Sequence, residues 1–338
     1  MICFTTASKK DLPKVRVLAK SIKRFHPNWP FYAVLTEPLG QIASSEKEAF
    51  SILQFDELGI EQVNSWIFMH NEIEARLAIK GPAVNYFFQN TKTDKLLYLD
   101  TSIFVFDSLE RIVDLLDQYS ICLVPQYTKP AAGVQQIIRQ EITTLREGSF
   151  DLSFLALKKD DQGTSFANWW ADRLFRYCYQ NDQQAIFFDQ KWCDLAPALF
   201  SRLYIIRDPC YNANVKNIGN RELSKSKENW LLDKQPIKLF RFMRLEKFGE
   251  PEICKSEIIR QLYERYEAEL RTHDEDSSSS TNWRFNVFDN GEIITDEMRW
   301  IYRQRPDLRK TYQQPFETNS NKKSLYRFLV RQANQKKD

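Results

Sequence analysis

The order of apolar and polar positions along the chain predicts an α/β fold. Short apolar runs at 2–4, 31–35, 95–99, 121–125 and 154–157 are typical of buried strands. Between the first two runs, Asp11-Leu12-Pro13 begins a segment with apolar residues at helical spacing, which predicts a helix. Strand, helix and strand in this order form a βαβ unit, so we expect a mostly parallel sheet flanked by helices.

A polar break separates two apolar runs near the middle of the first 200 residues. Asp100, Thr101 and Ser102 lie between Lys95–Leu99 and Ile103–Phe106. Because ligands of open α/β sheets bind at the carboxyl ends of the strands, Asp100 is well placed to contact a ligand. The same three residues are turn formers, so an ordinary turn at a strand end is the alternative interpretation.

Residues 71–89 have helical periodicity, which Gly81-Pro82 is expected to interrupt. Lys80 directly precedes this dipeptide. Its ammonium group would either contact a phosphate or extend over the surface into solvent. Residues 126–148 have weak periodicity, which favours an irregular connection that shapes a site.

Two further charged residues stand next to apolar or aromatic positions. Asp189 follows two phenylalanines and precedes an expected helix, so an N-cap is its first interpretation. Arg241 lies among the apolar residues of a predicted strand at 237–242. An unpaired guanidinium in a protein core costs several kcal/mol, so Arg241 must have a partner.

Composition narrows the class of protein. The 338 residues suffice for a sizeable core, and 48 Lys and Arg against 45 Asp and Glu leave a net charge of +3, so no global field attracts nucleic acid. The 6 cysteines form no CxxC pair and are interpreted as reduced structural thiols. With no signal peptide and no apolar run of membrane-spanning length, we expect a cytoplasmic protein.

The C-terminal part has a different pattern. A helix is predicted at 256–270, followed by a mobile, Ser-rich acidic linker near 272–282. Residues 322–337 form a basic amphipathic segment that would either dock on the protein or contact the inner membrane face peripherally. We therefore divide the chain into a domain at 1–245 and a helical extension at 246–338.

The run Asp189–Pro197 (DQKWCDLAP) is the most distinctive stretch of the chain. It is accompanied by shorter stretches, namely Thr5-Thr6, Lys80–Pro82, Tyr98–Asp100, Ser153–Leu157, Trp169–Leu174 and Phe288–Gly291. Together these stretches resemble bacterial nucleotide-sugar glycosyltransferases of the GT-A type, over most of the chain. The resemblance implies a Rossmann-like GT-A domain that transfers a sugar from a nucleoside diphosphate sugar to a glycan, lipid-linked or protein acceptor.

The resemblance also implies a metal site from which this chain departs. Family members usually read Tyr-Leu-Asp-Pro-Asp, whose acids hold a divalent metal on the diphosphate, and here Ser102 replaces the second acid. Where they usually place a histidine, this chain has Arg241. Since a metal or arginines can stabilise a departing diphosphate, we expect Arg241, with Arg244 and Lys80, to replace the metal. No metal cofactor is then required, and manganese or magnesium would take part only if Asp100 still binds a metal.

The remaining expectations concern the donor and the base. Thr5, Thr6 and Ser102 are expected in the donor site, and Asp100 is expected to bind ribose or sugar hydroxyls. Asp189 and Asp151 are the candidates for the catalytic base that activates the acceptor. The alternative function is a non-catalytic pseudoenzyme that binds a nucleotide sugar or a glycan.

Overall fold

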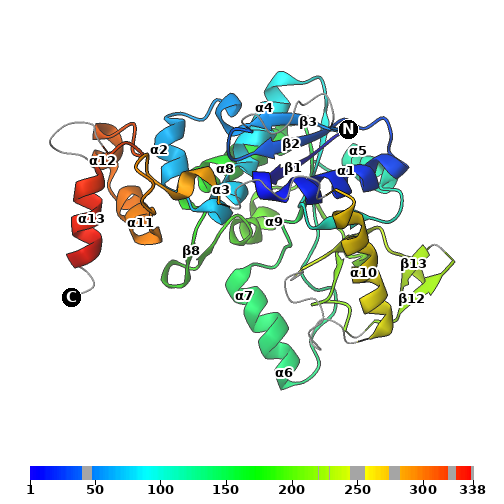
Figure 1. Ribbon diagram of the computed structural model, residues 1–338. Coiled ribbons are helices and arrows are strands. Elements are labelled where there is room, and N and C mark those ends of the chain that lie inside the picture. Colours follow the sequence, from blue (N-terminus) through cyan, green and yellow to red (C-terminus); the bar gives the residue numbers. More distant parts are fainter. Residues whose placement is uncertain are drawn as a thin grey trace.

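The computed structural model describes residues 1–39, 48–219, 221–227, 229–243, 256–273, 282–318 and 325–335. Its centre is a seven-stranded sheet of order β10-β6-β7-β4-β1-β2-β3 (Figure 1). These strands are β1 (Ile2–Ala7), β2 (Phe31–Leu35), β3 (Ser51–Gln54), β4 (Lys95–Leu99), β6 (Ile121–Leu123), β7 (Phe154–Lys158) and β10 (Leu203–Ile205). Neighbouring strands are parallel except that β7 runs antiparallel to both β4 and β6. The predicted mixed, mostly parallel sheet is confirmed.

Helices follow most of these strands. They are α1 (Leu12–Phe25), α2 (Val63–Phe68), α3 (Glu72–Ala78), α4 (Lys80–Asn90), α5 (Glu110–Gln118), α6 (Val134–Gln136), α7 (Thr143–Glu147), α8 (Asp161–Tyr177), α9 (Ala196–Leu199), α10 (Glu257–Arg271), α11 (Asp296–Gln304), α12 (Pro306–Thr311) and α13 (Leu325–Gln335). Between α6 and α7 the chain is π-helical, and this stretch is η4 (Ile137–Ile142). The short 3-10 helices are η1 (Lys9–Asp11), η3 (Phe55–Leu58), η5 (Asp182–Gln184), η6 (Lys191–Leu195), η7 (Pro209–Tyr211) and η9 (Arg284–Asn286).

Alternating side chains give the sheet two apolar faces, and helices cover both. On one face the core contains Tyr98 of β4, Phe87 of α4 and Trp170 of α8. On the other face, Leu97 of the same strand shares a core with α1 and α5. The sheet is therefore buried between two helical layers, as a mostly parallel sheet requires.

Smaller sheets complete the fold. They are β11-β15-β5, β12-β13-β14 and β8-β9, made of β5 (Ile103–Val105), β8 (Gln180–Asn181), β9 (Ile186–Phe187), β11 (Ala213–Asn214), β12 (Leu223–Ser226), β13 (Asn229–Leu232), β14 (Gln235–Pro236) and β15 (Leu239–Arg241). In the register of β15 with β5, Arg241 pairs with Ile103, and Phe242 N donates to Ser102 O at 2.8 Å. This pairing brings Arg241 to the end of β4.

The C-terminal helices pack on the main body. In Figure 1, α11, α12 and α13 gather at one end of the molecule, and α10 lies beside β12 and β13. Leu325 and Leu329 of α13 are buried in the same core as the sheet, so the docked interpretation of the basic C-terminal segment is confirmed for α13. Of the predicted linker near 272–282, residues 274–281 lie outside the described residues, as does the predicted boundary at 245/246. Within the described residues, no helix combines the length and apolarity needed to cross a membrane.

Two local predictions differ from the structure. The helical run at 71–89 is interrupted as predicted, but at Ile79 between α3 and α4, because Pro82 lies in the first turn of α4, where a missing N–H is tolerated. Gly81 allows close packing, since a Cβ there would lie 2.6 Å from Ala171 Cα of α8. The span 126–148 is not irregular throughout, because 134–147 is helical.

The described cysteines form no disulfide. They are Cys3, Cys122, Cys178, Cys193 and Cys210, and all are buried. Burial raises the pKa of the Cys3 thiol to about 12, so this side chain behaves as a small apolar group.

Candidate functional site

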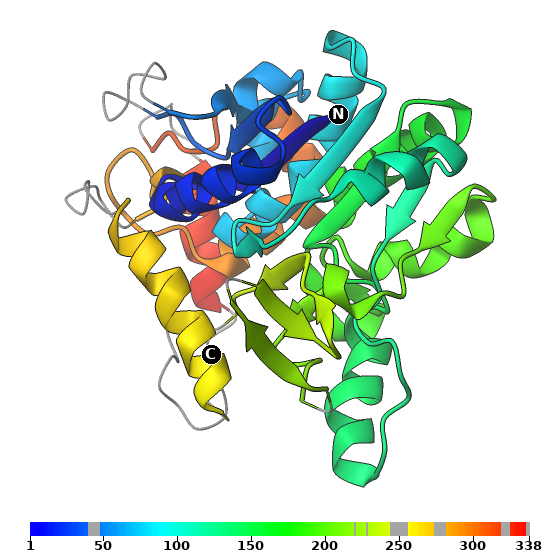
Figure 2. The same cartoon turned by 90° about the vertical axis from the view of Figure 1, so that its right-hand side faces the viewer.

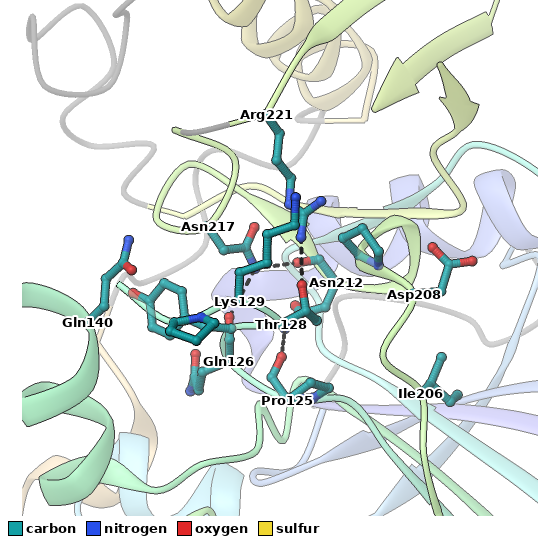
Figure 3. Close-up of a pocket in the computed structure, with 13 residues that line it drawn as sticks. Pro125, Gln126, Thr128, Lys129, Gln140, Ile206, Asp208, Asn212, Asn217 and Arg221 are labelled. Atoms are coloured by element: carbon teal, nitrogen blue, oxygen red, sulfur yellow. Dashed lines mark hydrogen bonds between the residues drawn. The ribbon is translucent and has the colours of Figure 1, made fainter. Parts of the chain in front are cut away.

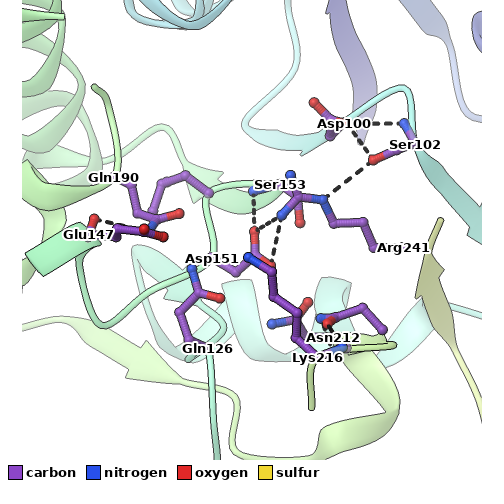
Figure 4. Close-up of polar contacts among 12 residues, drawn as sticks. Asp100, Ser102, Gln126, Glu147, Asp151, Ser153, Gln190, Asn212, Lys216 and Arg241 are labelled. Atoms are coloured by element: carbon purple, nitrogen blue, oxygen red, sulfur yellow. Dashed lines mark hydrogen bonds and ion pairs between the residues drawn. The ribbon is translucent and has the colours of Figure 1, made fainter. Parts of the chain in front are cut away.

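Asp100 lies at the carboxyl end of β4, as the sequence pattern predicts. Its Oδ1 accepts hydrogen bonds from Ser102 N at 3.0 Å and from Ser102 Oγ at 2.6 Å (Figure 4). Its backbone N–H donates to Ser153 O at 2.8 Å, which ties the turn to the start of β7. The turn-forming role of Ser102 and the placement of Asp100 at a strand end are therefore compatible, because one carboxylate oxygen holds the turn.

Arg241 has the partner that its apolar surroundings require. Its Nη1 donates to both carboxylate oxygens of Asp151, at 2.9 and 3.1 Å, and its Nε donates to Ser102 Oγ at 3.4 Å. Asp151 is 2% exposed at its side chain, whereas Arg241 is 26% exposed. The arginine thus connects the two aspartates of the site and keeps part of its surface open.

Arg76 of α3 belongs to the same charged cluster. Its Nη1 lies 3.7 Å from Asp11 Oδ2, and its side chain is 24% exposed. Burial would raise the pKa of Asp100, but the charges of Arg76 and Arg241 and the Ser102 hydrogen bond hold it well below its usual range. Asp100 is therefore ionised at neutral pH and surrounded by cations.

Lys80 and Asp189 form a buried ion pair beneath this cluster. Lys80 Nζ donates to Asp189 Oδ2 at 2.7 Å and to Leu152 O at 2.9 Å, and it lies 4.3 Å from the centre of the Tyr98 ring. The two side chains are 2% and 5% exposed. The interpretation of Lys80 as a surface lysine was wrong.

Asp189 is not a helix cap. The following 3-10 helix η6 begins at Lys191 with Gln190 at the capping position, and the Asp189 carboxylate turns to Lys80 instead. A buried ammonium group forms a stronger interaction with a carboxylate than exposed helix N–H groups do. The default interpretation of Asp189 was therefore wrong, and its catalytic role stays a prediction.

The two threonines expected in the donor site lie inside the fold. Thr5 and Thr6 are both fully buried in β1. Thr6 Oγ1 lies 3.3 Å from Tyr98 OH, and Thr5 Oγ1 has no hydrogen-bond partner among the described residues. They form part of the floor under the charged cluster. Arg244, the other expected donor contact, lies outside the described residues.

A polar pocket of about 100 Å³ adjoins the cluster (Figure 3). It is lined by residues of the loop after β6, of η4 and of the segment from η7 to β12, including Gln126, Gln140, Asn212 and Arg221. Asn212 Nδ2 donates to Pro125 O at 3.0 Å, and Arg221 Nη2 donates to Thr128 Oγ1 at 2.6 Å. Gln126 and Asn212 also appear beside Asp151 in Figure 4, so pocket and cluster are neighbours.

The described residues do not fit a divalent metal. Across the described ranges, no group of three or more His, Cys, Asp and Glu side chains is arranged to hold one. Asp151 is engaged by Arg241, and Asp100 is flanked by Arg76 and Arg241, whose positive charges oppose a second cation. The positively charged side chains at this strand end therefore favour an anionic ligand over a metal ion.

Arg76 is the site residue that the sequence interpretation missed. The sequence contained a sign of its role. Arg76 and Lys80 are four residues apart, and residues at this spacing in a helical pattern lie on the same face. Between α3 and α4 the cap residue Ile79 keeps right-handed helical backbone angles, and the charges of both Arg76 and Lys80 act on Asp100 at the end of β4. Periodicity alone does not say which strand end they reach.

The fold is that of the GT-A-type glycosyltransferases. The galactosyltransferase LgtC, crystallised with donor and acceptor sugar analogues, matches 81% of this chain and 96% of its own, with a TM-score of 0.50 and 14% identity. The glycosyltransferase GlyE of Streptococcus pneumoniae TIGR4 matches 85% of this chain and 66% of its own, with a TM-score of 0.44 and 13% identity.

Sequence comparisons give less information about the family than the structural comparisons do. No protein-family model matches the chain. The uncharacterised protein YfnF of Bacillus subtilis strain 168 is 24% identical over 156 residues, which are 45% of this chain. The match spans about half the length of that relative, 50%.

Proposed function

We propose that this chain transfers a sugar from a nucleoside diphosphate sugar to an acceptor hydroxyl, with arginines in place of a divalent metal at the diphosphate. The observation that supports the proposal is the cluster at the end of β4, where Asp100 is flanked by Arg76 and Arg241. In α/β folds of this kind ligands bind at that edge of the sheet.

Transfer breaks the bond between the sugar's anomeric carbon and a diphosphate oxygen, and a bond from the acceptor oxygen to that carbon forms. Negative charge grows on the departing diphosphate and must be stabilised. A guanidinium is permanently charged and its fork matches phosphate oxygens. Arg76 and Arg241, about a quarter exposed, are open to such a ligand, whereas Lys80 is buried and contributes through its charge.

The charges of the cluster suggest how the side chains rearrange when the nucleotide-sugar donor binds. The carboxylates of Asp100, Asp151 and Asp189 are balanced by Arg76, Lys80 and Arg241. A diphosphate adds negative charge, so its binding should draw Arg241 away from Asp151. In Figure 4 the ammonium end of Lys216 points toward Asp151, so Asp151 would lose one nearby cation and keep another when Arg241 moves.

This exchange favours Asp151 over Asp189 as the base that takes the acceptor proton. Burial raises the pKa of Asp151, but Arg241 and the hydrogen bond from Ser153 N lower it overall. Once Arg241 turns to the diphosphate, the pKa of Asp151 should rise and make it a better base. Asp189 keeps its partner Lys80 in either state.

A panel of nucleoside diphosphate sugars tests the proposal. We expect one donor to release its nucleoside diphosphate in excess chelator, with added manganese giving no further increase. Release that requires manganese would reject the arginine mechanism and retain the transferase. Tight donor binding without release, when glycan, lipid-linked and peptide acceptors have all been supplied, would select the non-catalytic alternative.

A further inference from the structure

The helix at 134–147, formed by α6, η4 and α7 and here called the projecting helix, extends away from the rest of the molecule. Figures 1 and 2 show it standing clear of the sheet and of the other helices. Its base is fixed by Lys191 Nζ, which donates to Leu145 O at 2.5 Å, and by Gln190 Nε2, which donates to Glu147 O at 3.0 Å. The helix is therefore an anchored element of the fold.

The projecting helix carries its apolar side outward. Val134, Ile142 and Leu145 are 71%, 53% and 73% exposed, and Ile137 and Ile138 are exposed as well. The half-buried positions that face the protein are polar, namely Gln136, Gln140, Thr143, Thr144 and Glu147. A surface helix normally turns its apolar side to the core. This inversion shows that the apolar side does not serve the core of this chain.

We propose that the exposed apolar side of the projecting helix binds a lipid surface by inserting into the headgroup region. Helices that lie in a membrane interface have this pattern of one apolar and one polar side. The polar side of the helix faces the protein, where Gln140 lines the pocket beside the charged cluster. A membrane contact at the outer side would thus leave the pocket open.

Size argues against a second protein as the occupant. A stable protein interface takes about 800 Å², or roughly 20–30 residues, from each partner. The projecting helix offers a narrow ridge of five apolar side chains, Val134, Ile137, Ile138, Ile142 and Leu145. Membrane insertion needs no matching surface, so a ridge at an extremity of the molecule suits it.

Charge has a minor part in the proposed contact. Arg139 is exposed, and the Arg146 side chain is 55% exposed beside Glu147. Glu141 is exposed as well, so the ridge has little net charge. We therefore expect binding to depend chiefly on the apolar side chains and to vary little with the fraction of anionic lipid. The basic helix α13 offers no equivalent surface, because Leu325 and Leu329 are buried.

Co-sedimentation of the full chain with vesicles tests the proposal. The vesicles are pure phosphatidylcholine and an equimolar mixture of phosphatidylcholine and phosphatidylglycerol. The wild type should bind both, and Val134→Ser/Leu145→Ser should bind roughly 30-fold more weakly, equivalent to about 2 kcal/mol. Ile142→Ser, in the middle of the ridge, should also weaken binding.

The matched control is Ile73→Ser/Ile293→Ser, which removes apolar side chains that are 57% and 72% exposed elsewhere on the molecule. It should bind vesicles like the wild type. Absence of wild-type binding, or equal loss in the ridge and control variants, would overturn the proposal. A wild-type dimer that the ridge variant converts to monomers, without vesicle binding, would assign the ridge to a second copy instead. No nucleotide sugar is present in the assay, so its outcome is independent of the proposed transfer.

Discussion

Replacing Lys80 with methionine should destabilise the protein more than replacing Lys80 and its partner Asp189 together. The Lys80 side chain is 2% exposed and its ammonium group lies 2.7 Å from Asp189 Oδ2. Lys80→Met leaves the Asp189 carboxylate buried without a cation. Removing one partner of a buried ion pair costs about 3–5 kcal/mol.

The double variant Lys80→Met/Asp189→Leu has no buried charge at this place. Trp170 Nε1 keeps its hydrogen bond, because it donates to the backbone O of Asp189. Imperfect packing and the hydrogen bond that Leu152 O loses should remain as costs, at about 1–3 kcal/mol in total. The two substitutions should therefore be coupled by at least about 2 kcal/mol.

The effect should also depend on pH. Burial lowers the pKa of Lys80, but the charges of Asp189 and Tyr98 raise it overall above its usual value. The unfolded chain has a lysine pKa of about 10.4, so this contribution to stability is complete below that pH. It is lost as the pH rises through the folded pKa. Wild-type stability should thus fall at high pH more steeply than that of the double variant.

Urea denaturation followed by circular dichroism measures all four proteins of this cycle, namely the wild type, Lys80→Met, Asp189→Leu and the double variant. Additive changes in the free energy of unfolding would refute the reasoning, as would a cost of less than about 1 kcal/mol for Lys80→Met. Either result would mean that the pair is solvated or dispensable.

Three further predictions concern packing and the charged cluster. Gly81→Ala should lower the free energy of unfolding, measured by urea denaturation, by about 1–3 kcal/mol, because its Cβ would meet Ala171 Cα at 2.6 Å. The control Gly219→Ala, with no described atom within 4 Å of its Cβ, should change that free energy by less than about 0.5 kcal/mol. Asp100→Asn should reduce the free energy of unfolding at neutral pH by about 1–2 kcal/mol. The stability that the ionised carboxylate contributes is lost as the pH falls through the lowered pKa of Asp100, so acid titration should show wild type and variant converging in stability. Asp151→Asn should lower the turnover of sugar transfer at least about tenfold, because it removes the proposed base. The affinity for nucleoside diphosphate should stay equal or rise, because Arg241 no longer has to leave a carboxylate. A loss of that affinity in calorimetry would contradict this prediction.

The strands and the place of Asp100 could be predicted from the sequence because buried strands are contiguous apolar runs. The demand that Arg241 have a partner was also predictable from its apolar neighbours. The identity of that partner was not, since Asp151 lies 90 residues away, before β7, and the pairing of β15 with β5 is what brings Arg241 to it. Likewise Lys80 and Asp189 are 109 residues apart, and no local pattern joins them.

The errors have local physical causes. The helical span 134–147 was missed although its apolar residues, at 134, 137, 138, 142 and 145, recur at helical spacing. The sequence does not show which side of this helix faces the protein, so its outward apolar side was not predictable. The helix break predicted at Gly81-Pro82 lies two residues earlier, at Ile79, because proline is tolerated in the first turn of the helix that follows the break. The antiparallel direction of β7 follows from its neighbours, and a single apolar run carries no sign of direction.

The most direct test of the arginine mechanism is a calorimetric titration with nucleoside diphosphates in excess chelator. The wild type is compared with Arg241→Gln, and with Lys238→Gln as a matched control, because Lys238 has a similarly exposed side chain but pairs with Asp107 outside the cluster. We predict binding by the wild type and the control, and at least about tenfold weaker binding by Arg241→Gln, since charge-assisted hydrogen bonds contribute about 1.5–3 kcal/mol each. Wild-type binding that appears only with manganese, or equal affinity of Arg241→Gln, would contradict the account.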